Sequence, residues 1–377
     1  MAIFLIIFLL IYLSPSIYVY IRIFKLFSHK LSKVIFTITF WVLIFLFPVT
    51  EMLTHSGISD SWNTFLLCGY LILPFLLYLF LCVLVRDLLL TVNRWLKIIA
   101  VEKLHTPGMK IGTLITLMII PAVMVISGMI TYADIKENRY QIEIPRRSSA
   151  LQHLRIILAS DFHLRQLTAE HFMPDFVSRV NALQADILLI PGDILEGDRE
   201  DEQVKEFERQ FSQIRTTYGI YASFGNHEFY HGGGRTDFFK NSHITVLTDT
   251  TILIDHSFAL VGRNDEQFHK RKPIGDLVKD LPDTLPVVVL DHQPTDLQNI
   301  SASGADILVS GHTHNGQLYP FNYIASMIYE LSWGYKKINK THVFVTSGIQ
   351  LWGPPVRTTG DSEIIVIDVI LTGLKKS

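Results

Sequence analysis

Five places in the second half of this 377-residue chain combine aspartate, histidine and asparagine directly after an apolar run. These polar groups are Asp161-Phe162-His163, Gly192-Asp193, Gly225-Asn226-His227-Glu228, Asp291-His292 and Gly311-His312-Thr313-His314. Carboxylate, imidazole and amide-oxygen ligands suit borderline and harder divalent ions such as Zn, Mn and Fe. Two such ions ~3.5–4 Å apart can hold both the attacking and the leaving oxygens of a displacement, and they lower the pKa of bound water to about 7. Metal-assisted hydrolysis at phosphorus is therefore the chemistry that these residues predict.

The apolar runs before these groups predict the elements that position them. The runs are Ile156 to Ser160, Ile187 to Ile190, Ile220 to Phe224, Val287 to Leu290 and Ile307 to Ser310. Short, uninterrupted runs of Ile, Val and Leu are typical of strands that are buried on both faces. Ligands collect at the carboxyl ends of such strands in layered α/β sheets. We therefore expect an α/β fold in which all five polar groups form one site.

Each motif alone is weak evidence, because an Asp-x-His triplet or a Gly-Asp pair is common in ordinary turns. Their joint occurrence in one order is more specific. Over about Leu154 to Asp368 the sequence resembles the calcineurin-like metallophosphoesterases, with all five motifs in family order. The strings Gly311-His-Thr-His-Asn-Gly-Gln317 and Gly353-Pro-Pro-Val-Arg357 are similar to the membrane-anchored bacterial branch of that family. The resemblance implies a four-layer αββα sandwich.

The resemblance also implies a role for each polar residue. The first metal ion would be bound by Asp161, His163, Asp193 and His314. Asp193 would also bind the second ion, whose other ligands would be Asn226, His292 and His312. His227 would be the catalytic group that is not a ligand, protonating the leaving oxygen and contacting the phosphate. The cofactor predicted is a pair of divalent ions, either Mn, Zn or Fe.

The first third of the chain is a different kind of sequence. Its four apolar segments are Ala2 to Phe24, Val34 to Val49, Thr64 to Val85 and Ile111 to Thr131. A helix needs about 20 apolar residues to cross a bilayer. The sequence therefore predicts an all-α transmembrane region of about four helices at 1–131, then a tether and first strand at 132–150. The metallophosphoesterase domain would follow at 151–377.

Charge suggests an orientation for the chain. Two of the predicted connections, from Arg22 to Lys33 and from Arg86 to Lys110, are basic, whereas Thr50 to Asn63 has no Lys or Arg. The positive-inside rule places the basic loops in the cytoplasm, so we expect a multi-pass protein of the cell membrane with an extracytoplasmic catalytic domain. Residues 132–377 contain 24 Lys and Arg against 31 Asp and Glu. That acidic balance argues against nucleic acid as a partner.

These observations predict a membrane-anchored phosphoesterase with two metal ions that hydrolyses phosphate monoesters, diesters or pyrophosphates. The membrane region favours a lipid or nucleotide-sugar-lipid substrate and membrane lipids as partners, while a soluble substrate stays open as the alternative. A second class is a non-enzymatic membrane protein that only binds metal or a partner. Transport has less support, because the apolar segments contain almost no ionisable residues. The oligomeric state stays open.

Overall fold

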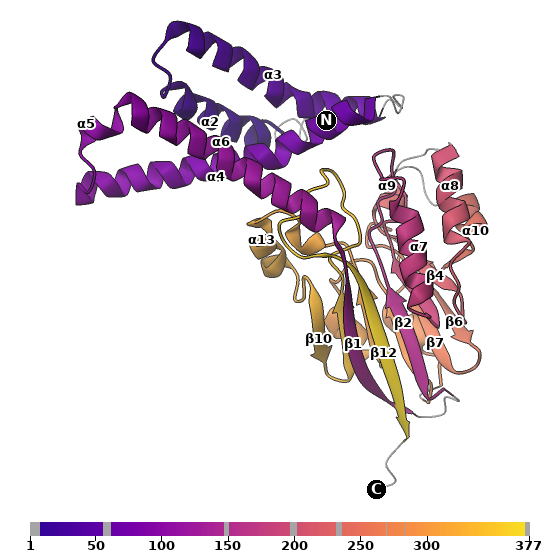
Figure 1. The fold of residues 1–377 in the computed structure, drawn as a ribbon. Coiled ribbons are helices and arrows are strands. Elements are labelled where there is room, and N and C mark those ends of the chain that lie inside the picture. The colour runs from indigo at the N-terminus through magenta and orange to yellow at the C-terminus, as the bar shows by residue number, and fades with distance from the viewer. Residues whose placement is uncertain are drawn as a thin grey trace. The chain divides into compact units, whose positions relative to one another are not determined.

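The structure, a computed structural model, describes residues 8–55, 62–146, 151–196, 202–230, 236–268, 270–282 and 284–373. The chain divides into two units. One consists of Met1–Ile130 together with Gly353–Thr358, and the other of Thr131–Trp352 together with Thr359–Ser377. The first unit is helical and the second is α/β (Figure 1).

The helical unit is built from long apolar helices. In chain order they are the π-helical turn η1 (Phe8–Leu13), α2 (Ser14–Phe24), α3 (Lys30–His55), α4 (Asn63–Leu96), α5 (Val101–Leu104) and α6 (Pro107–Ala133). Among the described residues, α3, α4 and α6 are long and apolar enough to cross a membrane. The described part of the predicted first span, Leu10–Phe24, is a shorter apolar helix, and the start of that span lies outside the described residues.

Apolar side chains occupy both the inside and the outside of this unit. Val19, Ile44 and Val83 pack in its core, whereas Ile38 on α3 and Val123 on α6 are exposed. A helix that is apolar on every side is typical of a membrane span, because lipid covers the outward face. The unit therefore has the surface that a membrane region requires.

The first sheet of the α/β unit has six strands in the order β1-β12-β2-β3-β4-β5. Their bounds are β1 Ile135–Arg146, β2 His153–Leu158, β3 Ile187–Pro191, β4 Ile220–Ser223, β5 Ile244–Val246 and β12 Ser362–Gly373. β2 to β5 pair in parallel, β12 is antiparallel to β2, and β1 is parallel to β12. The two long strands β1 and β12 run side by side in Figure 1. The polar ends of β2, β3 and β4 therefore lie at the same edge.

The second sheet also has six strands, in the order β10-β11-β9-β8-β7-β6. Their bounds are β6 Thr250–Ile254, β7 Phe258–Gly262, β8 Val287–Leu290, β9 Ile307–Ser310, β10 Gly334–Ile338 and β11 Thr341–Val345. β7, β8, β9 and β11 are parallel, while the edge strands β6 and β10 are antiparallel to their neighbours. The ends of β8 and β9 therefore lie together as well.

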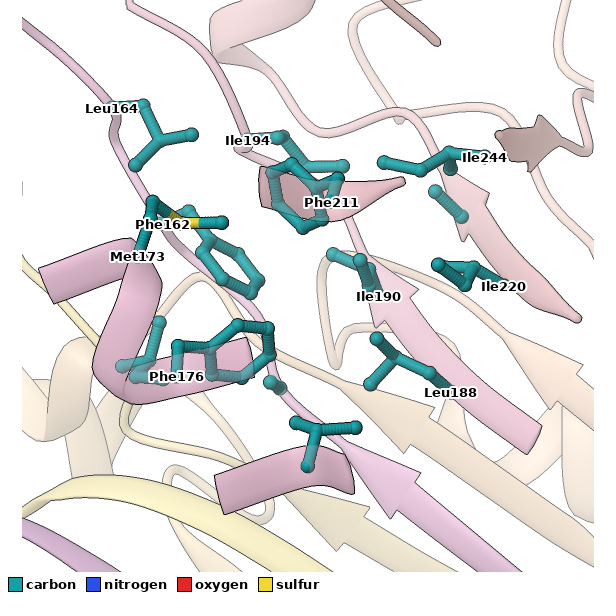
Figure 2. Packing of buried hydrophobic residues seen from close by; sticks show 14 of the residues in the cluster. Phe162, Leu164, Met173, Phe176, Leu188, Ile190, Ile194, Phe211, Ile220 and Ile244 are labelled. Carbon is teal, nitrogen blue, oxygen red and sulfur yellow. The ribbon is translucent and has the colours of Figure 1, made fainter. Parts of the chain in front are cut away.

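Alternating strand residues separate the unit into layers. Ile156 and Leu158 of β2 point into the core between the two sheets, while Ile157 points to the helices over the first sheet. Those helices are α7 (Phe172–Ala182), α8 (Glu202–Phe211) and α10 (Thr236–Asn241). Figure 2 shows Phe176 and Phe211 packed over β3 residues Leu188 and Ile190. α11 (Ile274–Val278) and α12 (Leu297–Ala302) cover the second sheet. The predicted four-layer αββα sandwich is confirmed.

Candidate metal centre

The predicted site residues meet where five strands end. Among the described residues, three groups have ligand atoms within 4.8 Å of one another and could hold a metal ion. The first group is Asp161, His163 and His314, and the second group is Asp193, His292 and His312. A third set, His163, Asp193 and His227, overlaps with both. Asn226 joins the second group through its side-chain oxygen. The structure therefore brings together all seven predicted metal-binding residues and the predicted catalytic histidine.

The first group combines side chains that follow β2 and β9, one strand from each sheet. The Nε2 atoms of His163 and His314 are 3.2 Å apart. Oδ1 of Asp161 lies 3.7 Å from Nε2 of His314 and 3.9 Å from Nε2 of His163. One carboxylate and two imidazoles thus face a common point.

The second group follows β3, β4, β8 and β9. Oδ1 of Asn226 lies 2.9 Å from Nδ1 of His312 and 3.1 Å from Nε2 of His292. Nε2 of His292 is 3.2 Å from Oδ2 of Asp193. Nδ1 of His292 donates to the carbonyl of Pro191 at 2.7 Å, which turns Nε2 toward the site.

Asp193 lies between the two groups. Its Oδ2 atom is 3.2 Å from Nε2 of His292 in the second group and 3.8 Å from Nε2 of His163 in the first. The same oxygen is 4.0 Å from Nε2 of His227. The Asp193 carboxylate is therefore placed to be shared by two cations.

The atoms that meet here accept hydrogen bonds or donate electron pairs. Neither Oδ1 of Asn226 nor the Asp193 carboxylate can donate a hydrogen bond, so a proton or a metal ion at Nε2 of His292 would satisfy both oxygens. Although burial lowers the pKa of His292, the charge and hydrogen bond of Asp193, together with the charges of Asp161 and Asp265, raise this pKa well above its ordinary value. A divalent ion would satisfy the same atoms together, so this set of side chains fits a metal.

Buried charges set the ionisation of the other groups. Burial raises the pKa of Asp161. Burial opposes ionisation of Asp193 as well, but the neighbouring charge on His292 holds the pKa of Asp193 well below its usual range. Burial and the charge of His292 lower the pKa of His312 to about 3, so the His312 ring is neutral at pH 7. A neutral imidazole and an ionised carboxylate are the forms that bind metals.

Glu196 is a site residue that sequence reasoning missed. Its Oε1 atom lies 2.5 Å from Nδ1 of His163 and 2.8 Å from Nδ1 of His227. Both histidines therefore direct Nε2 toward Asp193. Burial lowers the pKa of His227, but Glu196 and Asp193 outweigh this effect and raise it. The only signal in the sequence was an acidic residue three positions after Asp193.

Glu228 holds the loop that carries Asp193. Its carboxylate accepts hydrogen bonds from the backbone N–H groups of Asp193 at 3.0 Å, Ile194 at 2.7 Å and Gly225 at 2.7 Å. Asp291, which precedes His292, accepts a hydrogen bond from Arg263 at 2.9 Å.

The backbone at the strand ends is strained. The left-handed φ angles are 58° at Asp161, 42° at His163, 55° at Asp193, 71° at His312 and 47° at His314. Residues with a Cβ reach this region at a cost of order 1–3 kcal/mol each. Such strain persists only where the surrounding contacts enforce it, and it concentrates at functional sites.

Comparisons with known proteins agree with this geometry. Residues 154–316 match the family model described as calcineurin-like phosphoesterase. An "Uncharacterized metallophosphoesterase" of Helicobacter pylori is 31% identical over 226 residues, which are 58% of this chain and 60% of the relative. A "Transmembrane protein with metallophosphoesterase domain" of Danio rerio is 28% identical over 78% of this chain and 70% of its own length.

A further relative, the "UDP-2,3-diacylglucosamine pyrophosphatase LpxG" of Chlamydia trachomatis, is 23% identical over 49% of this chain and 70% of its own length. The chain spans about three fifths of the length of the Helicobacter pylori relative. The three candidate spans and the transmembrane relative together support association with a membrane.

An αββα sandwich with an Asp, His and Asn cluster at its strand ends defines the metallophosphoesterase class of fold. Within the α/β unit, residues 154–316, which match the calcineurin-like phosphoesterase model, contain this cluster.

Proposed function

We propose that this chain is a membrane-anchored, metal-dependent phosphoester hydrolase. Residues 1–131 form the anchor, and residues 151–377 form the catalytic domain. The observation that carries the proposal is the position of Asp193, whose Oδ2 atom lies near histidines of both metal-binding groups. The ligands proposed for the first ion are Asp161, His163, Asp193 and His314. Those proposed for the second ion are Asp193, Asn226, His292 and His312.

When bound, two divalent ions would activate water and polarise the phosphoryl group. Mn, Zn and Fe suit this mixture of oxygen and nitrogen ligands. The protein supplies the proton for the leaving group. His227 has its Nδ1 atom beside Glu196 and Nε2 toward the site, and the carboxylates of Glu196 and Asp193 raise the pKa of His227, which favours the protonated ring that a general acid needs. His227 is therefore the proposed general acid, and it also contacts the phosphate.

A lipid-linked phosphate ester or pyrophosphate is the proposed substrate class. Its first support is the membrane region, since an anchored enzyme meets lipids at a high local concentration. Its second support is the chlamydial relative, whose printed name describes a pyrophosphatase of a diacylated nucleotide sugar. The proposal for the membrane side is that the catalytic domain is extracytoplasmic in a multi-pass protein, because the basic connections face the cytoplasm.

Activity of the purified full-length protein in detergent tests the function. After chelation and reloading with Mn²⁺, the protein should cleave bis(p-nitrophenyl) phosphate, and Asp193→Ala should lower kcat/KM by about 10³-fold. Loss of a shared metal ligand removes several kcal/mol of transition-state stabilisation, which corresponds to a factor of this size. Asp280→Asn, at an exposed position, should leave the rate unchanged. Full activity in Asp193→Ala would contradict the site.

The same preparation separates the alternatives. A protein that binds Mn²⁺ tightly but turns over neither soluble nor lipid-linked phosphoesters would support the non-enzymatic metal-binding function. A strong preference for soluble esters over phospholipid-like substrates in mixed micelles would reject only the lipid part of the proposal. Hydrolysis of both soluble and lipid-linked esters would support the phosphoesterase activity without deciding between the two substrate classes.

A further inference from the structure

The α/β unit has an exposed apolar surface on helix α13 (Phe321–Ile328) and the turn before it. We call it the α13 surface, and it consists of Tyr319, Phe321, Tyr323, Ile324, Met327 and Ile328. Met327 exposes 77% of its surface, Ile328 69% and Tyr323 57%. No Asp, Glu, Lys or Arg occurs from residue 315 to residue 329. A contiguous apolar patch of this kind marks an interaction site.

The exposed side chains lie on one side of α13. Tyr323 and Met327 are four residues apart, as are Ile324 and Ile328, so the two pairs form neighbouring rows along the helix. Ala325 is the buried residue of this helix. The small Ala325 thus faces the unit while the large apolar side chains face outward, which is the reverse of an ordinary surface helix.

α13 is joined closely to the metal centre. The short 3-10 helix η3 (His314–Gly316) precedes it, and a Cβ added to Gly316 would lie 2.4 Å from the backbone N of Asn322. After the helix, the ring of Tyr329 lies 6.1 Å from the ring of His312. α13 therefore lies next to His312 and His314 of the metal centre.

An exposed tryptophan lies beside His227. The ring of Trp352 is 6.2 Å from the ring of His227, and Trp352 is 54% exposed. Tyrosine and tryptophan are the residues enriched at membrane–water interfaces, because one part of each ring is apolar and another is polar. An exposed residue of the interfacial type thus lies near His227, while α13 ends beside Tyr329, whose ring is near His312.

We propose that the α13 surface inserts into the interface of the lipid bilayer in which the chain is anchored. The linkage along the chain supports this occupant, since only Asp134 lies between α6, a candidate span, and β1 of the first sheet. The absence of charged side chains from 315 to 329 removes the barrier to insertion. Insertion places the metal centre at the level of lipid phosphates, and this inference holds whether or not the proposed activity is correct.

A fluorescent probe on α13 tests the insertion. The full-length protein would carry Cys68→Ser, Cys82→Ser and Met327→Cys, labelled with an environment-sensitive fluorophore and reconstituted into vesicles of phosphatidylcholine and phosphatidylglycerol. Lipids with a nitroxide near the headgroup should quench this probe, and aqueous iodide should not. The matched control is Lys205→Cys on α8, an exposed position, where iodide should quench and the lipid nitroxide should not.

Equal quenching of both probes by iodide would overturn the proposal. A blue-shifted Met327 probe that lipid nitroxides do not quench would also overturn it, because a protein partner such as a second copy would then cover the surface. A second variant, Ile324→Asp with Met327→Asp, should leave cleavage of a soluble chromogenic diester within about twofold. It should slow cleavage of a vesicle-borne phosphodiester by about tenfold, because charged side chains oppose insertion.

Discussion

At the scale of single residues, the geometry of the centre depends on the partner of each histidine's Nδ1 atom. Pro191 accepts the Nδ1 proton of His292, and Glu196 lies beside the Nδ1 atoms of His163 and His227. Partners of this kind select the tautomer that leaves Nε2 available, and their loss typically lowers activity or metal affinity by about 10–100-fold. The partners are therefore as necessary as the ligands.

Glu196→Gln should lower kcat by about 10–100-fold and move the pH profile. The negative charge of Glu196 raises the pKa of His227. Its removal lowers that pKa, so the proton donor is lost earlier as the pH rises, and the alkaline limb of the kcat profile should shift to lower pH. Activity measured across pH with saturating Mn²⁺ checks this result, with Glu170→Gln at an exposed position as control. An unchanged alkaline limb would show that Glu196 has only a structural role.

Several of these residues could be predicted from sequence, and others could not. Ligand types with a fixed order along the chain, such as His312 and His314, are visible because each follows an apolar run. Glu196 does not directly follow an apolar run, and acidic residues are common in loops, so its sequence context does not indicate a role in the site. Its role becomes visible only when two histidines from different loops approach one carboxylate.

At the scale of elements, the close approach of two loops builds the site. The loops after β3 and β4 cross where Gly225 faces Asp193, and a Cβ added to Gly225 would lie 2.2 Å from Oδ1 of Asp193. His227 N–H donates to the same Oδ1 atom at 3.0 Å. Glycine is therefore required at this position because a side chain would displace the shared carboxylate.

Gly225→Ala should reduce activity by at least about tenfold and lower the metal content of the purified protein. A Cβ at this distance must move Asp193, and a displacement of about 1 Å can cost up to 10²-fold in rate. Activity and bound Mn²⁺ measured on one sample check this result. Gly275→Ala is the matched control, since a Cβ there meets no atom within 4 Å. Wild-type activity in Gly225→Ala would mean that the loops after β3 and β4 can move apart to accept the added Cβ without displacing Asp193.

Element prediction succeeded where burial dominates. The predicted Val287 to Leu290 and Ile307 to Ser310 coincide with β8 and β9, because strands buried on both faces are continuous apolar runs. β1 occupies most of the segment 132–150 that was predicted as a tether and first strand, since its polar residues pair with β12 more than 200 positions later. β10 was not predicted, because its Lys-rich sequence is typical of an exposed edge strand. Pairing partners remote in sequence leave no local signal.

At the scale of the whole molecule, two kinds of surface belong to one chain. The helical unit has exposed apolar side chains on α3 and α6, whereas the metal-binding residues all belong to the α/β unit. The division into an apolar helical unit and a unit with the candidate metal centre follows from this contrast. The side of the membrane on which the α/β unit lies determines which lipid leaflet it can reach.

Fusions at the C-terminus should report an extracytoplasmic catalytic domain. Alkaline phosphatase, which is active only outside the bacterial cytoplasm, should be active in such a fusion, and a green fluorescent protein fusion should be dark. The physical reason is the retention of the basic connections in the cytoplasm. A control pair fused within the segment 86–110 should give the opposite pattern. A fluorescent C-terminal fusion would reverse the proposed orientation.

Residues Gly353–Thr358 belong to the helical unit although they follow β11 in the chain. Within that unit the N–H of Arg357 donates to the carbonyl of Gly128 at 2.9 Å, and Arg357 is fully buried. The ribosome synthesises the apolar helices long before it reaches residues 353–358. The helical unit therefore begins to form first but cannot be complete until these residues are made. A nascent chain must therefore hold an incomplete helical unit until residues 353–358 have emerged from the ribosome.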